Sequence, residues 1–126
     1  MTKDKFLSVF NQVFDIVCDH YGYSKHHDSH PHIEIEDSEC YDTEVNPTLM
    51  GEYCNVNNVL TLYWKNIHTI ESLIRTVVHE YQHYLQSPSW MTRYYNMGYN
   101  YNNHPYEIEA YSEEDNWKTF NKILTL

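Results

Sequence analysis

The sequence predicts an α+β fold organised as a single domain over residues 1–126. Two observations predict the fold class: apolar residues recur at helical spacing near both ends of the chain, and short strand-like segments separated by turn residues lie between them. A third observation concerns size, because a chain of 126 residues with no internal repeat and no Gly/Ser-rich linker suits one domain.

The N-terminal half is predicted to form one helix followed by a small sheet. Apolar side chains follow helical spacing over residues 2–21, and Gly22 favours a helix end. Asn57 and Asn58 favour a tight turn between the last two of four short strands. These strands are predicted at 32–35, 41–45, 51–55 and 59–64.

Two further helices are predicted in the C-terminal half. The first covers residues 69–86 and ends before Pro88, because proline cannot continue a helix without losing a hydrogen bond. An aromatic and Asn-rich connection follows over residues 90–104. The last helix begins at Pro105, since proline suits a first helical position, and reaches about residue 124.

The second helix carries a candidate metal site, His79-Glu80-Tyr81-Gln82-His83. Residues four apart share a helical face, so both imidazoles can bind one ion while Glu80 lies close by. Zinc held by two histidines and one carboxylate keeps a fourth position for water, which the metal and a glutamate base can activate. Two solvated surface histidines would give the same pattern. A third ligand is therefore needed to distinguish a metal site from surface histidines.

The last helix offers that third ligand. With about 100° per residue, Glu109 falls on the stripe of Tyr106, Ala110 and Phe120, and Glu113 lies near it. By the same projection Glu107 falls on a solvated face. A buried carboxylate needs a metal or a hydrogen-bond partner. We therefore expect Glu109 to be the third ligand and Glu113 to accept a hydrogen bond from a ligand imidazole.

His79-Glu80-x-x-His83 followed by Glu109-Ala110-x-x-Glu113 resembles the gluzincin metallopeptidases, and the context from His104 onward is similar to small phage and bacterial zincins. The resemblance covers residues 69–120. It implies a minimal zincin-like fold with an N-terminal helix, a small mixed or antiparallel sheet, an active-site helix and a third-ligand helix. It also implies a zinc metalloendopeptidase with one Zn²⁺ per chain and Glu80 as general base. An edge strand, at 51–55 or 59–64, would hold an extended peptide.

Other candidates remain open. The connection between the two ligand-bearing helices should form one wall of the substrate cleft. From it, Tyr95, Tyr99, Tyr101 or His104 could donate a hydrogen bond to the oxyanion that forms on the substrate carbonyl. Residues 26–32 are rich in histidine. They predict either a polar loop or a second metal site.

Composition and charge argue against two classes of partner, nucleic acids and membranes. A formal net charge of -10 leaves no basic stripe for nucleic acid, and no apolar run is long enough to span a membrane. An odd number of cysteines without C-x-x-C spacing favours reduced thiols and a cytoplasmic, intracellular location. The resemblance to small phage zincins is compatible with a phage-encoded protein. We expect a monomer acting on a peptide or protein substrate. The alternatives are a catalytically silent zincin-fold binding or virion protein and a metal-free scaffold.

Overall fold

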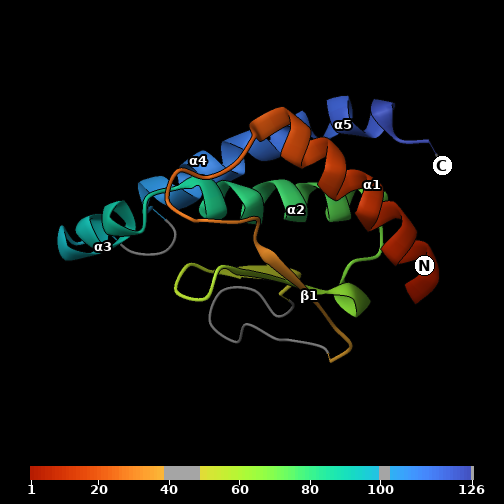
Figure 1. Ribbon diagram of the computed structural model, residues 1–126, viewed down its shortest axis with the longest axis horizontal. Coiled ribbons are helices and arrows are strands. Elements are labelled where there is room, and N and C mark those ends of the chain that lie inside the picture. The colour runs from red at the N-terminus through yellow and green to blue at the C-terminus, as the bar shows by residue number, and fades with distance from the viewer. Residues whose placement is uncertain (39–48, 100–102, 126) are drawn as a thin grey trace.

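The computed structural model describes residues 1–38, 49–99 and 103–125, and it confirms the α+β prediction (Figure 1). A long helix precedes a small sheet, and the remaining helices follow the sheet. The elements are α1 (Lys3–Tyr21), β1 (His32–Glu36), β2 (Gly51–Cys54), β3 (Val59–Tyr63), the 3₁₀ turn η1 (Trp64–Asn66), α2 (Ile70–Leu85), α3 (Pro88–Asn96), α4 (Pro105–Glu113), the 3₁₀ turn η2 (Glu114–Asn116) and α5 (Trp117–Ile123).

The sheet is mixed, with the strand order β1-β3-β2. β3 pairs in parallel with β1, so that Ile33 is opposite Leu60, and it pairs antiparallel with β2, so that Gly51 is opposite Leu62. Asn58, with a φ of 55°, lies in the tight turn that joins β2 to β3, as predicted. The strand predicted at 41–45 lies outside the described residues.

α1 begins and ends where the sequence predicts. The Thr2 side chain accepts a hydrogen bond from the backbone N–H of Lys5 at 3.2 Å and so caps the first turn. At the other end Gly22 has a φ of 77°, a value that glycine adopts without strain, and its N–H donates to the carbonyl of Cys18.

α2 is the central element of the core, because it contacts α1, β2, α4 and α5 (Figure 1). Its apolar side chains follow helical spacing, and those in the middle of the helix, from Leu73 to Tyr84, are fully buried. Gly51 lets β2 approach α2 closely, since a Cβ there would lie 2.8 Å from Cγ2 of Thr76. The fully buried apolar residues of α1, β3 and α2 are Phe6, Val9, Val13, Val17, Leu60, Leu62, Leu73, Ile74, Val77, Val78, Tyr81 and Tyr84.

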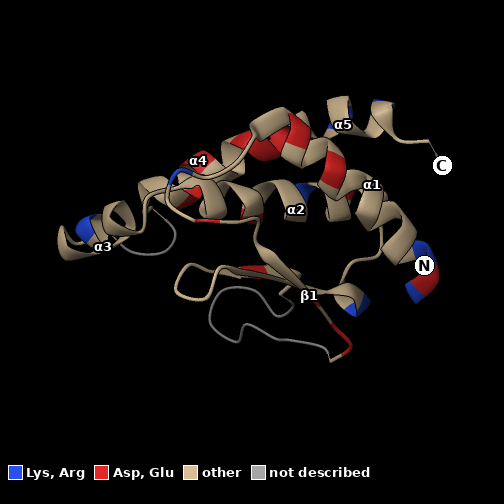
Figure 2. Cartoon of the chain, viewed as in Figure 1, with Lys and Arg blue, Asp and Glu red and all other residues tan. Residues whose placement is uncertain are grey.

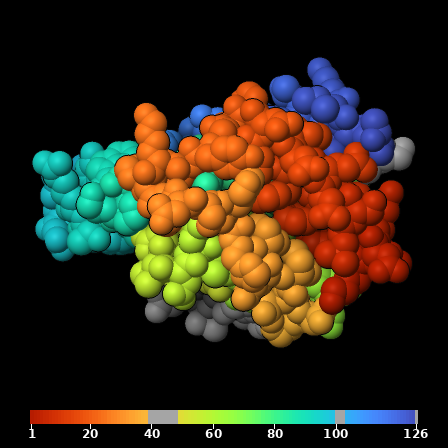
Figure 3. All heavy atoms as spheres, in the orientation of Figure 1, coloured from red at the N-terminus to blue at the C-terminus, as the bar shows by residue number. Residues whose placement is uncertain are grey.

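The C-terminal region differs from the prediction in two ways. The connection expected at 90–104 contains helix α3, which begins at Pro88, has no buried residue and projects from one end of the molecule (Figures 1 and 3). The helix expected from Pro105 to residue 124 is instead divided into α4 and α5 by η2. Pro88 both ends α2 and occupies a first helical position of α3, a position that proline favours.

Acidic residues are prominent along α1 and α4, whereas Lys and Arg are scattered (Figure 2). In the part of the chain that the structure describes, no helix combines the length and the apolar character needed to cross a membrane.

Candidate metal centre

His79 and His83 lie side by side on α2, with ring centroids 5.0 Å apart. The helix is fixed at its start by Thr69, whose side chain accepts from the backbone N–H of Ser72 at 3.0 Å. Four residues of helix bring the two imidazoles onto one face. Both are buried, with 7% and 9% of their surfaces exposed, so they are not solvated surface histidines.

The carboxylate that meets these imidazoles belongs to Glu107. Its Oε1 lies 2.5 Å from Nε2 of His83, and its Oε2 lies 3.3 Å from Nε2 of His79. Glu107 is 5% exposed and occupies the first turn of α4. The positive end of the α4 dipole favours a carboxylate in that turn.

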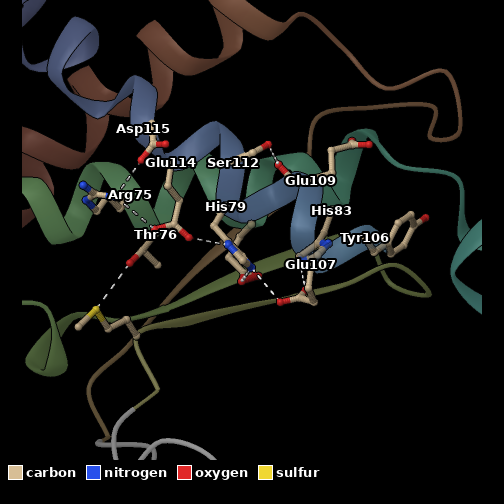
Figure 4. A network of polar contacts seen from close by, with 12 residues as sticks. Arg75, Thr76, His79, His83, Tyr106, Glu107, Glu109, Ser112, Glu114 and Asp115 are labelled. Carbon is tan, nitrogen blue, oxygen red and sulfur yellow. Dashed lines mark hydrogen bonds and ion pairs between the residues drawn. The ribbon is translucent and has the colours of Figure 1, made fainter. Parts of the chain in front are cut away.

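Glu109, the ligand expected from the sequence, does not face the imidazoles. Figure 4 shows its side chain directed away from them, and it is exposed, accepting a hydrogen bond from Nε2 of Gln86 at 3.2 Å. The expectation that Glu107 is solvated and Glu109 is buried is therefore wrong. The cause is η2: its three residues turn by about 120° each instead of 100°, which rotates Trp117 and Phe120 by roughly 60° relative to α4. Projecting these apolar residues back to Glu109 as one continuous helix gives the wrong face.

The second nitrogen of His79 has an anionic partner. Nδ1 of His79 lies 2.8 Å from Oε2 of Glu114, the first residue of η2. Arg75 lies near Glu114, with Nη1 3.9 Å from Oε1 of that carboxylate (Figure 4). Its guanidinium also packs over the Trp117 ring. Acceptors of this kind fix the ring orientation of metal-binding histidines.

Glu113, which the sequence suggested for this role, makes other contacts. It accepts hydrogen bonds from Tyr21 Oη at 3.0 Å and from Asn116 Nδ2 at 2.8 Å, and so joins α1 to the C-terminal helices. The prediction that Glu113 accepts from a ligand imidazole is therefore wrong. The next residue, Glu114, contacts His79 instead, because it follows Glu107 by seven residues, about two helical turns, and so lies on the same face of α4.

His83 has a neutral partner for its second nitrogen. Nδ1 of His83 lies 2.7 Å from Oε1 of Gln86, which caps the C-terminal end of α2. Because each Nδ1 faces an acceptor oxygen, each neutral imidazole carries its hydrogen there and directs the lone pair of Nε2 toward Glu107.

Electrostatics around Glu107 favour a positive charge. Burial alone would lower the pKa of His79, but its ion pairs with Glu107 and Glu114 outweigh burial and raise the pKa. The pKa of His83 is raised in the same way, by Glu107 and then by Glu80. Burial would raise the pKa of Glu107, yet the two imidazoles hold it below its usual range.

The donor set fits a zinc-type ion. Two neutral imidazole nitrogens and a carboxylate oxygen are the ligands of catalytic zinc sites. Oε2 of Glu107 is buried and, among the described residues, has no hydrogen-bond partner. Lone pairs of two neutral Nε2 atoms cannot be satisfied by the carboxylate oxygens that they face, so either a proton on the imidazole or a bound cation fits between them.

Glu80 lies beside this group. One ligand atom from each of His79, Glu80 and His83 lies within 4.8 Å of the other two, and Oε1 of Glu80 is 3.9 Å from Nε2 of His79. Burial raises the pKa of Glu80, and the neighbouring His83 and His79 oppose that rise. A general base works best when its pKa lies near the working pH, so a raised pKa suits proton transfer.

A cleft of about 270 Å³ opens onto these residues. Helix α3 and strand β2 form its walls, and β2 is an edge strand of the described sheet because β3 lies between β2 and β1. β3 pairs with a strand on each side, so residues 59–64 are not the edge strand that was the other candidate for binding a peptide. The cleft is lined by Leu49, Gly51, Glu52, Tyr53, Glu80, His83, Met91, Tyr95 and Glu107.

The four residues suggested as oxyanion donors differ in their position relative to the cleft. Tyr95 lines the cleft and is 46% exposed. Tyr99 packs its ring against Tyr94 and does not line the cleft, while residue 101 lies outside the described residues.

His104 is not a free donor. It is 1% exposed, its Nε2 lies 3.0 Å from the carbonyl of Met91, and its Nδ1 accepts from the backbone N–H of Tyr106 at the start of α4. His104 is therefore a helix cap, and the suggestion that it donates to an oxyanion is wrong because both ring nitrogens are engaged. Its ring packs 4.5 Å from that of Tyr95, which helps to hold Tyr95 at the cleft.

The histidine-rich stretch at 26–32 does not gather its imidazoles. His27 stacks on Tyr84, with its Nε2 3.0 Å from Tyr53 Oη, whereas the His30 ring packs against Tyr23. Within residues 1–38, 49–99 and 103–125, the stretch contributes no group of three metal-binding side chains. These contacts fit the polar-loop interpretation.

Three contributors to the site escaped sequence reasoning: Glu107, Gln86 and Glu114. Glu107 had a usable signal, since an acid in the first turn after a Pro-initiated helix start is favoured by the helix dipole. Helical spacing places Glu114 on the same face as Glu107, so it could be found once Glu107 was chosen. Gln86 lies after the last turn of α2, where helical periodicity makes no prediction. No family model matches the chain, and no curated protein or solved structure matches it either. Its function therefore has to be inferred from the chemistry of this centre.

Proposed function

We propose that this protein is a zinc-dependent metallopeptidase in which His79, His83 and Glu107 hold the metal and Glu80 is the general base. One observation carries the proposal: the buried carboxylate of Glu107 approaches Nε2 of both histidines, and within the part of the chain that the structure describes its Oε2 has no hydrogen-bond partner. Buried charges in proteins are paired or bind metals. The Nδ1 partners of both histidines direct the Nε2 lone pairs toward Glu107, and a metal held by all three side chains would satisfy them together.

When bound, zinc would supply Lewis-acid polarisation of a peptide carbonyl and of a water molecule. Glu80, buried beside the histidines, accepts a proton from the attacking water at its carboxylate and returns it to the leaving amine. The raised pKa of Glu80, caused mainly by burial, brings that carboxylate closer to the range in which it can do both.

The cleft supports an extended peptide as the substrate. Edge strands offer unpaired backbone groups, and β2 lies at the cleft wall next to Glu80 and His83. Tyr95, at the cleft, is the residue to which we assign hydrogen bonding to the oxyanion that forms on the scissile carbonyl.

Elemental analysis together with a peptide-library cleavage assay tests this function. We expect about one zinc per chain and metal-dependent cleavage that Glu80→Gln removes. A matched control is Glu36→Gln, which makes the same change on β1, at the opposite edge of the sheet from β2. Stoichiometric zinc without cleavage of any peptide would instead support a silent binding protein, and absence of zinc would support a metal-free scaffold.

A further inference from the structure

The neutral residue Gln86 contacts the candidate metal centre differently from the carboxylates around it. Its backbone N–H donates to the carbonyl of Gln82 at 3.0 Å and ends α2, and its side chain is 5% exposed. The side chain thus lies in the interior, between α2 and the first turn of α4. An amide in such a place must satisfy both its oxygen and its nitrogen.

The orientation of the Gln86 amide is determined by two acceptors. Nε2 donates to the backbone carbonyl of Tyr106 at 3.1 Å and to Oε1 of Glu109 at 3.2 Å. Neither partner can donate, so a flipped amide would place its oxygen against two other oxygens. The amide oxygen must therefore face His83, at 2.7 Å from Nδ1.

We propose that Gln86, held by Tyr106 and Glu109, is a positioning relay that fixes the ring of His83 and keeps its Nε2 directed at the metal. Because the amide oxygen only accepts, Nδ1 of His83 is the donor of this pair, and Nε2 is the nitrogen left for a ligand. This inference rests on the proposed metal site. In this relay Glu109 acts on His83 indirectly, by accepting a hydrogen bond from the Gln86 amide that contacts the imidazole.

A neutral relay also suits the charge of the centre. Glu80, Glu107 and Glu114 already bring three carboxylates to the two imidazoles. Gln86 orients the second imidazole without adding a fourth charge, which would be costly in a buried place. Glu109 stays outside as an exposed acceptor, so we expect its contribution to be smaller than that of Gln86.

The relay is tested by zinc titration against a competing chelator, with the Nδ1–H signal of zinc-loaded His83 followed by NMR. Gln86→Leu should weaken zinc affinity by roughly 10- to 100-fold and abolish the slowly exchanging Nδ1–H signal. Glu109→Ala should weaken affinity by a smaller factor, and Glu109→Gln should restore it, because the new amide oxygen can still accept from Gln86. Ile108→Ala, at the exposed neighbouring position, is the control and should change nothing.

The outcomes separate the relay from the function on which it rests. If wild-type protein binds no zinc, both proposals fall. If wild type binds zinc and Gln86→Leu keeps the same affinity and the same signal, the relay alone falls. A merely structural link between α2 and α4 would lower the Tm of the metal-free variants while leaving zinc affinity unchanged. Should Gln86→Leu fail to fold, the relay stands or falls on the loss in Glu109→Ala and its recovery in Glu109→Gln.

Discussion

The carboxylate of Glu107 lies 2.5 Å from Nε2 of His83, although the two residues come from different helices. The contact depends on the first turn of α4 lying against the C-terminal half of α2, where Gln86 also bonds to the carbonyl of Tyr106. It places the negative charge of Glu107 between the two imidazoles. The site is thus built by one helix pair, with β2 completing the adjoining cleft.

The first prediction concerns the third ligand. Glu107→Ala should abolish tight zinc binding because it removes the only described carboxylate that contacts Nε2 of both histidines. Glu109→Ala should keep zinc affinity within about tenfold of wild type, the lower limit for a group that acts through a neighbour. Zinc titration of both variants decides between them, and loss confined to Glu109→Ala would show that α4 has a different helical phase.

A second pair of variants separates two adjacent acids. Glu114→Ala should weaken zinc affinity by about tenfold or more, because it removes the acceptor at Nδ1 of His79. Glu113→Ala should leave zinc affinity unchanged and lower the free energy of unfolding by about 1 kcal/mol for each lost hydrogen bond to Tyr21 and Asn116. Chelator competition and urea unfolding measure the two effects. Equal zinc affinities in both variants would contradict the assignment.

Replacing the base should separate binding from chemistry. Glu80→Gln should keep zinc and fold but lower kcat by about 10² or more, the usual scale for losing a general base. The measurement is peptide cleavage by protein whose zinc content has been verified. Cleavage at the wild-type rate by the fully loaded variant would remove Glu80 from the mechanism.

Tyr95 should affect the chemical step more than substrate binding. Tyr95→Phe removes the hydroxyl but keeps the ring that packs against His104, so kcat should fall by about 10² while KM changes little. Tyr99→Phe makes the same change at a residue that does not line the cleft and should have no effect. Steady-state kinetics of the two variants provide the comparison, and equal kcat values would exclude Tyr95 as the oxyanion donor.

Metal removal should destabilise the fold, because the proposed ion joins α2 to α4. Zinc at about 1,000 times its Kd would add roughly 4 kcal/mol to the free energy of unfolding. A chelator should therefore lower the Tm of wild type, and His79→Ala should have a Tm that does not respond to chelator. A chelator-sensitive Tm in His79→Ala would place the metal elsewhere.

The helices α1 and α2, the hairpin β2–β3 and the histidine pair were all predictable from the sequence. Each depends on local geometry: apolar spacing determines which face of α1 and α2 is buried, and Gly22 and Asn58 take the backbone conformations that such residues favour. The pairing of His79 with His83 is equally local, since four residues of helix separate them whatever surrounds the helix.

Only the tertiary structure decided which acids meet those histidines. A sequence projection assumes one uniform helix from Pro105 onward, but η2 changes the twist after α4. Trp117 and Phe120, which follow η2, therefore do not mark the face of α4 on which Glu107 and Glu109 lie. The contact of Glu114 with Nδ1 of His79 depends on where α4 and η2 pack against α2. The orientation of the Gln86 amide toward His83 likewise depends on acceptors in α4. Helical spacing gives a residue's angle about its own axis, whereas a ligand set depends on the distance between two axes, and that distance is determined by packing.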